Sequence, residues 1–138
     1  MKIYSFEKLE AWQHARKLTV WVYRITAKYP EEEKFGIISQ MRRAALAIAS
    51  NIAEGTSRVT SKDQCHFSTI AYSSTIELLN DIIISLDLLF LDENNYAEGR
   101  NLIEKQTYLI SQLRKSQQTM KGSKLSNPLN PSKPSKPL

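Results

Sequence analysis

The chain has little of the material on which several protein classes depend. Its one cysteine in 138 residues, Cys65, cannot form an intramolecular disulfide, so nothing indicates a secreted fold held together by disulfides. Its four glycines lie too far apart in the sequence for a dinucleotide fingerprint or a phosphate-binding loop. No serine lies between two glycines at the spacing of a nucleophile elbow, so that hydrolase motif is absent too.

A long hydrophobic run is also missing. The most apolar stretch, 76–91, is interrupted by Glu77, Asn80, Asp81 and Asp87 and is too short to span a membrane. The first residues lack the apolar core of a signal peptide. We therefore expect a cytoplasmic protein with no membrane partner.

Positive charge is abundant, but little of it belongs to the body of the chain. The net charge is +5, and residues 121–138 contribute four lysines and no acid. Residues 1–120 hold the other 15 basic residues and all 14 acidic ones, which leaves a net charge of +1. Any nucleic-acid surface on the body must therefore come from local clustering of basic residues.

Apolar residues recur at helical spacing in four segments, and no alternating segment favours a sheet. The stripe of the second segment consists of Ile38, Met41, Ala45, Ile48 and Ile52. The connections between the segments are short, which favours antiparallel neighbours. We predict an all-α protein, an antiparallel up-down-up-down four-helix bundle over residues 1–121.

The last part of the chain has a different composition. Residues 122–138 contain four of the five prolines, and Ser-Lys-Pro occurs twice in succession. Such a segment cannot bury a core, so we predict a disordered, Lys/Pro/Ser-rich tail. A solubilising role is favoured over a partner-binding motif, because short lysine-proline tracts carry little specificity.

Local signals predict where the first helix begins and ends. Ser5 is expected to cap a helix that runs from about Phe6 to Lys28. Pro30 ends that helix, because proline disfavours helical geometry in the residue before it. The acidic run 31–33 then sits where the second helix begins, and the helix dipole favours negative charge there.

The remaining boundaries are predicted in the same way. Gly55 is expected to end the second helix as a left-handed cap. Residues 61–64 have the S-x-x-Q form of a capping box and open the third helix. The fourth helix is expected to be capped by Asn94 or Asn95 and to continue to about Lys121.

The third segment carries more apolar surface than one core face requires. Over 76–91 apolar residues cover most of the helix circumference. Trp21 also lies to the side of the core stripe of the first helix. Apolar patches of this extent mark interfaces, so we predict a homo-oligomer.

The two histidines do not form a metal motif. A di-metal carboxylate site in a bundle needs two E-x-x-H motifs and two further glutamates. Residue Ala11 precedes His14 by three positions, so the motif fails there, and the D-x-x-H at 63–66 has no twin. We expect no metal and no other cofactor, with His14 and His66 at a surface or an interface.

A polar group interrupts the apolar second and third segments and is expected to face the bundle. Its members are Asn51, Glu54, Gly55 and Glu77. Burying a carboxylate without a partner is expensive, so both glutamates should meet a base or backbone donors.

Four basic residues, Arg42, Arg43, Arg58 and Lys62, allow two interpretations. In the first they pair with carboxylates and set the register of the helices. Arg43 and Glu54 lie about 16 Å apart along one helix, so they could pair only with other helices or subunits. In the second they contact phosphates, with Arg58 and Lys62 the most accessible because they lie in or beside a loop.

Several short blocks together resemble one known family. The blocks are Phe-Glu-Lys-Leu-Glu-Ala-Trp at 6–12, Tyr-Pro at 29–30, Gln-Met-Arg-Arg-Ala-Ala at 40–45, and Asn-Ile-Ala-Glu-Gly at 51–55 followed by Arg58. Over about residues 5–115 the chain resembles the four-helix-bundle proteins of the 23S rRNA intervening-sequence family. The block at 51–55 after the Arg-Arg-Ala-Ala segment is the most specific part of this likeness.

The resemblance implies a homopentameric ring of bundles and a role with nucleic acid. One departure is Ser73-Ser74 in the third helix, where the family usually has a glycine just before a serine. We therefore expect a non-catalytic protein without a small-molecule substrate that binds RNA or DNA, or serves as a ribonucleoprotein accessory factor. The alternative is an oligomeric scaffold that binds protein partners, with a purely structural polar cluster.

Overall fold

The computed structural model describes residues 1–126, with side chains through residue 119. This part of the chain contains four α-helices, two 3-10 turns and no strand, which confirms the all-α prediction. The helices are α1 (Glu10–Thr26), α2 (Ile37–Thr56), α3 (Ser61–Asp87) and α4 (Glu93–Ser126), and the 3-10 turns are η1 (Ser5–Lys8) and η2 (Glu31–Glu33). No helix of the described residues is both long enough and apolar enough to cross a membrane.

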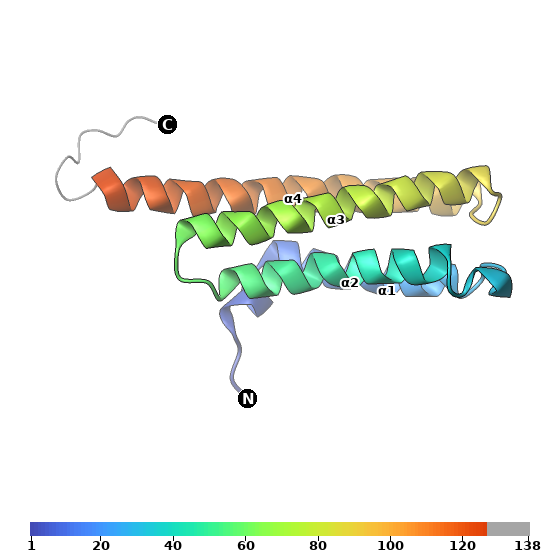
Figure 1. Ribbon diagram of the computed structural model, residues 1–138, viewed down its shortest axis with the longest axis horizontal. Coiled ribbons are helices and arrows are strands. Elements are labelled where there is room, and N and C mark those ends of the chain that lie inside the picture. The colour runs from blue at the N-terminus through green and yellow to red at the C-terminus, as the bar shows by residue number, and fades with distance from the viewer. Residues whose placement is uncertain (127–138) are drawn as a thin grey trace.

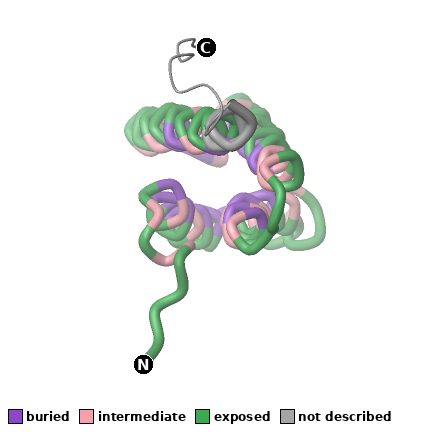
Figure 2. The backbone as a smooth tube through the Cα atoms, turned by 90° about the vertical axis from the view of Figure 1, so that its left-hand side faces the viewer, coloured by how far each residue is buried: buried purple, intermediate pink, exposed green. Residues whose placement is uncertain are grey.

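The helices pack as two layers of two. Contacts join α1 to α2, α2 to α3, α3 to α4 and α1 to α4, while the diagonal pairs do not touch within the described residues. The α2–α3 connection lies at one end of the molecule, and the other two connections lie together at the opposite end (Figure 1). Viewed along the bundle, the buried residues lie on the sides of the helices that face one another (Figure 2).

The core is made by the apolar stripes that the helical spacing predicted. All five stripe residues of α2 are buried, and they meet Leu18 and Val22 of α1 and Leu78 and Ile82 of α3. Burial of a large aliphatic side chain contributes about 1.5–3 kcal/mol. Removal of these faces from water therefore supplies the main force that holds the four helices together.

The first helix begins later than predicted. Residues 5–8 form the separate turn η1, and Leu9 is extended, with φ −77° and ψ 129°, before α1 starts at Glu10. Ser5 is therefore not the cap of a long helix. The Glu7 carboxylate instead accepts a hydrogen bond of 2.8 Å from the Tyr4 backbone N–H and closes this short turn.

The acidic run 31–33 also forms a turn of its own. It is the 3-10 turn η2 after Pro30, and α2 begins only at Ile37 with no acid in its first turn. The prediction that these glutamates lie at the start of α2 and complement its helix dipole is therefore wrong.

Gly55 is not a left-handed cap. The helix α2 continues through Thr56, and no glycine of the described residues has positive φ. The missing side chain matters for another reason, because a Cβ at Gly55 would lie 2.8 Å from the Phe67 Cβ of α3. Glycine here allows α3 to approach the last turn of α2.

The starts of α3 and α4 are each set by a residue that precedes the predicted cap, by one position at α3 and by two or three at α4. The Thr60 hydroxyl, not that of Ser61, accepts the Asp63 N–H at 3.1 Å. At α4 the Asp92 carboxylate accepts the Asn95 N–H at 2.7 Å. The same helix continues to Ser126, beyond the predicted end near Lys121, and the rest of the predicted tail, 127–138, lies outside the described residues.

Trp21 lies inside the bundle and not at its predicted outer interface. Its side chain is 2% exposed, and Nε1 donates a 3.1 Å hydrogen bond to Glu98. A Cβ at Gly99 would lie 2.6 Å from Cη2 of this ring. The glycine of α4 therefore makes the space that a large indole ring needs between α1 and α4.

Candidate functional site

The four basic residues singled out in the sequence do not form one site. Arg42 and Arg43 lie within α2, whereas Arg58 and Lys62 lie around the α2–α3 connection. Fifteen residues separate Arg43 from Arg58, which corresponds to about 22 Å of helix. One pocket therefore cannot hold both Arg42–Arg43 and Arg58–Lys62, and the two pairs are described separately.

Arg42 makes its contacts within the bundle, with residues of α1. Its side chain is half-buried, and Nε donates a 2.9 Å hydrogen bond to the Thr26 hydroxyl of α1. The guanidinium also lies over the Tyr23 ring, 4.5 Å from its centroid. Arg42 thus joins α2 to the end of α1, while its neighbour Arg43 is exposed.

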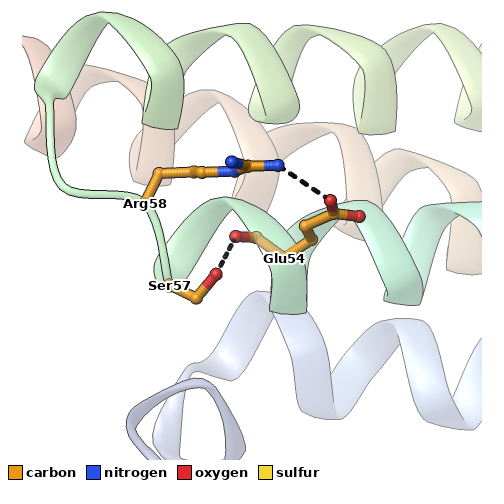
Figure 3. A network of polar contacts seen from close by, with 3 residues as sticks. All are labelled: Glu54, Ser57 and Arg58. Carbon is orange, nitrogen blue, oxygen red and sulfur yellow. Dashed lines mark hydrogen bonds and ion pairs between the residues drawn. The ribbon is translucent and has the colours of Figure 1, made fainter.

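Arg58 is exposed but held in one orientation (Figure 3). Its Nη2 lies 3.0 Å from the Glu54 carboxylate one helical turn earlier, and its guanidinium lies 4.7 Å from the centroid of the Phe67 ring. The Ser57 hydroxyl donates to the Glu54 backbone carbonyl at 2.7 Å. The expectation that Glu54 meets a base is confirmed, but its burial is not, because its side chain is exposed. Lys62 is exposed and makes no ion pair with a described residue.

The other members of the expected polar cluster do not gather around Glu54. Glu77 is exposed, so the prediction that it faces the interior of the bundle is wrong. The Asn51 amide donates to the Ala47 carbonyl of its own helix at 2.8 Å. Gly55 contributes close packing instead of a polar contact.

The buried carboxylate belongs to Asp81, one turn after Glu77. Its side chain is 2% exposed, and the Gln40 amide of α2 donates to both of its oxygens at 3.1 and 3.2 Å. Burial raises the pKa of Asp81, an effect that the Asn80 and Gln40 hydrogen bonds oppose. The burial of Asp81 could have been predicted from the sequence, because this residue follows Ala71 and Leu78 at the spacing of the core face.

A set of polar contacts that the sequence did not reveal joins α1 to α4. A His14 ring nitrogen, Nε2, lies 2.9 Å from the Leu102 carbonyl, and the Gln106 amide donates to the Ala11 carbonyl at 3.0 Å. His14 is buried, contrary to its expected place at a surface, and burial lowers its pKa. His66 is exposed. Within residues 1–126 no three histidine, cysteine or acidic side chains come together where they could hold a metal ion.

Charge is segregated between the two ends of the bundle. The end with two connections is brought together by the Tyr29 and Phe90 rings, whose centroids are 5.4 Å apart. Its acidic residues are Glu31, Glu32, Glu33, Asp87, Asp92 and Glu93, and its nearby bases are Lys28 and Lys34. The opposite half carries Arg58 and Lys62 together with the acids Glu54 and Asp63. Helix α4 adds Arg114, whose backbone carbonyl lies against Cys65 near the start of α3, and Lys115. The excess of acids at the first end leaves an excess of bases over the rest of the body, although the net charge of residues 1–120 is only +1.

Apolar side chains are also left exposed, on two different faces. One face combines α1 and α2 and includes Val20, Tyr23, Phe35 and Leu46, beside a groove of about 440 Å³ that Arg42 and Arg43 also line. The other lies on the outer side of α3 and includes Ile76, Ile84 and Leu88. Large exposed apolar patches mark interaction surfaces.

A known protein family matches the chain. The family described as 23S rRNA-intervening sequence protein matches residues 7–117, which is most of the chain. No curated protein sequence matches.

Proposed function

We propose that this chain, which belongs to the 23S rRNA-intervening sequence protein family, is a non-catalytic cytoplasmic protein that binds structured RNA or DNA through the basic end of its bundle. The observation that carries the proposal is the segregation of charge, because it gives a body of net charge +1 a positive surface. The family description supports a connection with ribosomal RNA sequences.

The contacts at the basic end suit phosphate binding without base recognition. Arg58 is exposed and already oriented by Glu54 and Phe67, so little side-chain entropy is lost when its guanidinium meets a phosphate. Lys62 provides a second positive charge in the first turn of α3. Phosphate contacts of this kind position a nucleic acid and carry no sequence information directly.

The assembly that we propose is a homo-oligomer of antiparallel up-down-up-down bundles. Gln40 contacts Asp81 near one end of α2, and Gly55 approaches Phe67 near the other, which supports opposite directions for α2 and α3. The two exposed apolar faces support self-association through unlike surfaces, an arrangement that closes into rings. Five subunits are favoured by the family resemblance, and repetition of the basic end would provide avidity.

The test is binding of a labelled RNA hairpin to the full chain, followed by fluorescence anisotropy between 50 and 200 mM salt. We expect affinity to fall steeply with salt, by a slope of about −0.9 for each neutralised phosphate of duplex DNA. The double variant Arg58→Glu with Lys62→Glu should weaken binding strongly. The matched control, Lys28→Glu with Lys34→Glu at the acidic end, has the same change in net charge and should keep most of the affinity. Equal losses in the two variants would contradict a localised site.

The second candidate is a protein-interaction scaffold, which the exposed apolar faces favour. If the wild-type chain binds no hairpin or duplex at 50 mM salt but forms an oligomer in light scattering, the scaffold is the better description. A monomer mass at micromolar concentration would remove the oligomer from both proposals.

A further inference from the structure

A groove of about 420 Å³ lies on the outer surface between α3 and α4. Its floor is Ile110, which is fully buried. Its walls are polar and are formed by Thr69, Tyr72 and Ser73 of α3 and by Ser111, Arg114 and Lys115 of α4. None of these residues was singled out for nucleic-acid binding by the sequence patterns.

The walls of the groove are regular because they follow helical spacing. On α4, Ser111 and Lys115 are four residues apart, and on α3, Thr69 and Ser73 have the same spacing, so each pair lies along one face of its helix. Lys62 lies seven residues before Thr69, which places it on the same face of α3 towards the α2–α3 connection. The groove therefore continues towards the basic end described above.

The positive charge of the groove is not balanced by acids. No carboxylate lines it, and the chain has no acidic residue after Glu104. Neither Arg114 nor Lys115 makes an ion pair with a described residue. The groove between α1 and α4, of about 350 Å³, is different, because Glu98 lines it together with Lys17, Arg24 and Lys105. Lys105 also makes an ion pair of 3.9 Å with Glu10.

The groove also presents an aromatic ring to solvent. The Tyr72 side chain is 38% exposed, and no described residue hydrogen-bonds to its hydroxyl. Tyr108, one turn before Ser111 on α4, is 60% exposed. An exposed ring beside unpaired cations is the combination that binds single strands, because every base has a face that can stack on an aromatic side chain.

We infer that the α3–α4 groove binds an unpaired strand of nucleic acid, with its phosphates on Arg114, Lys115 and Lys62 and a base stacked on Tyr72. The inference rests on the proposed function and extends it from duplex or folded nucleic acid to single-stranded segments. Sequence preference should be weak, since the wall residues offer charge, hydroxyls and an aromatic face, with Gln118 as the one amide and no carboxylate for base edges.

The test compares two labelled ligands, an oligouridine and a fully paired hairpin of the same length, on the full chain. Tyr72→Ala should weaken oligouridine binding about tenfold while leaving its salt slope and the hairpin affinity unchanged, because stacking involves no counterion release. Tyr72→Phe keeps the ring and should keep the affinity. Arg114→Glu with Lys115→Glu should reduce the single-strand slope by about 1.4. Lys17→Glu with Arg24→Glu, in the groove that contains Glu98, is the matched control and should keep oligouridine affinity.

The outcomes separate the groove from the proposed function. If hairpin binding depends on Arg58 and Lys62 while the groove variants change nothing, the proposed function stands and the groove inference is wrong. If Tyr72→Ala changes the mass in light scattering without changing oligouridine affinity, the groove is a subunit contact and the inference is also wrong. If the wild-type chain binds neither ligand at 50 mM salt, both proposals fall.

Discussion

At one end of the bundle the chain turns twice, between α1 and α2 and between α3 and α4, and at the other it turns once. The end with two turns collects acidic residues from η2 and from the α3–α4 connection. The end with one turn carries Arg58 and Lys62, and the long helix α4 adds Arg114 and Lys115 nearby. The difference shows that net charge is a poor guide to this protein, since opposite charges that cancel in sum are kept apart by the length of the helices.

The division of charge between the two ends of the bundle is tested most directly by changing the charges of one end at a time. Arg58→Glu with Lys62→Glu should remove up to two duplex phosphate contacts and reduce the duplex salt slope by about 1.8. Replacing the three glutamates of 31–33 by glutamine should leave that slope unchanged. Anisotropy titrations at several salt concentrations measure both, and a slope that moves with net charge alone would contradict a division of roles between the ends.

Close packing can be tested at Gly55, beside the single connection. Gly55→Ala places a Cβ 2.8 Å from the Phe67 Cβ, so the strain of overpacking should exceed the gain in helix propensity. We expect a net loss of about 1–2 kcal/mol in the free energy of unfolding, measured by urea denaturation. Gly36→Ala is the control, because its Cβ would meet the flexible end of Glu33. Equal stability of the two variants would show that α3 has room to move away.

The buried carboxyl of Asp81 predicts a pH dependence that the exposed acids do not share. Its pKa is raised above 3.8 in the folded state, so the folded protein holds this proton to higher pH than the unfolded chain does. The contribution of Asp81 to stability therefore falls as pH rises from about 3.8 through the folded pKa, and the penalty is complete above it.

Replacing Asp81 with an uncharged residue should remove the cost in stability of ionising a buried carboxyl. Asp81→Asn is expected to raise the melting temperature by a few degrees at pH 7 and to lose this advantage below pH 3.8. Glu77→Gln, at the exposed position one turn earlier, should change the melting temperature little at either pH. A lower melting temperature for Asp81→Asn at pH 7 would mean that the ionised carboxylate stabilises the fold through Gln40.

The smallest expected effect concerns the ion pair of Glu54 with Arg58. Both side chains are exposed, so Glu54→Gln should lower stability by only about 0.3–0.5 kcal/mol. The same change weakens the contact that orients the Arg58 guanidinium, so hairpin affinity should fall slightly. A rise in affinity would indicate that the Glu54 carboxylate competes with phosphate for Arg58.

Much of the fold could be predicted from the sequence because the periodicity of apolar residues is a local property. The four helices and the buried stripe of α2 are confirmed, since a helix that repeats apolar residues every three or four positions must bury that face. The family could also be recognised from short blocks of residues, and the match over 7–117 confirms it. The helix starts differ from the prediction by one to three residues, because Thr60 and Asp92 have side chains that can accept the same capping hydrogen bonds as Ser61, Asn94 and Asn95.

The candidate site depended on contacts that no local pattern contains. The same residue types have different environments: Glu77 is exposed while Asp81 is buried, and Arg42 is engaged with α1 while Arg43 is exposed. Each difference is set by which neighbouring helix faces the side chain and how closely it approaches. The predictions that Gly55 is a helix cap and that Trp21 lies at an outer interface were wrong for the same reason. Their surroundings are formed by Phe67 and Gly99 on other helices.

By itself, then, the sequence determined the four helices, their apolar faces and the family, because those depend on residues that are near one another along the chain. Only the tertiary structure decided which carboxylate is buried, which arginines are engaged, and where the charges gather. The physical reason is that burial and electrostatic potential depend on distances between helices. Residues as far apart in sequence as Thr69 and Lys115 line one groove only when α3 and α4 pack together.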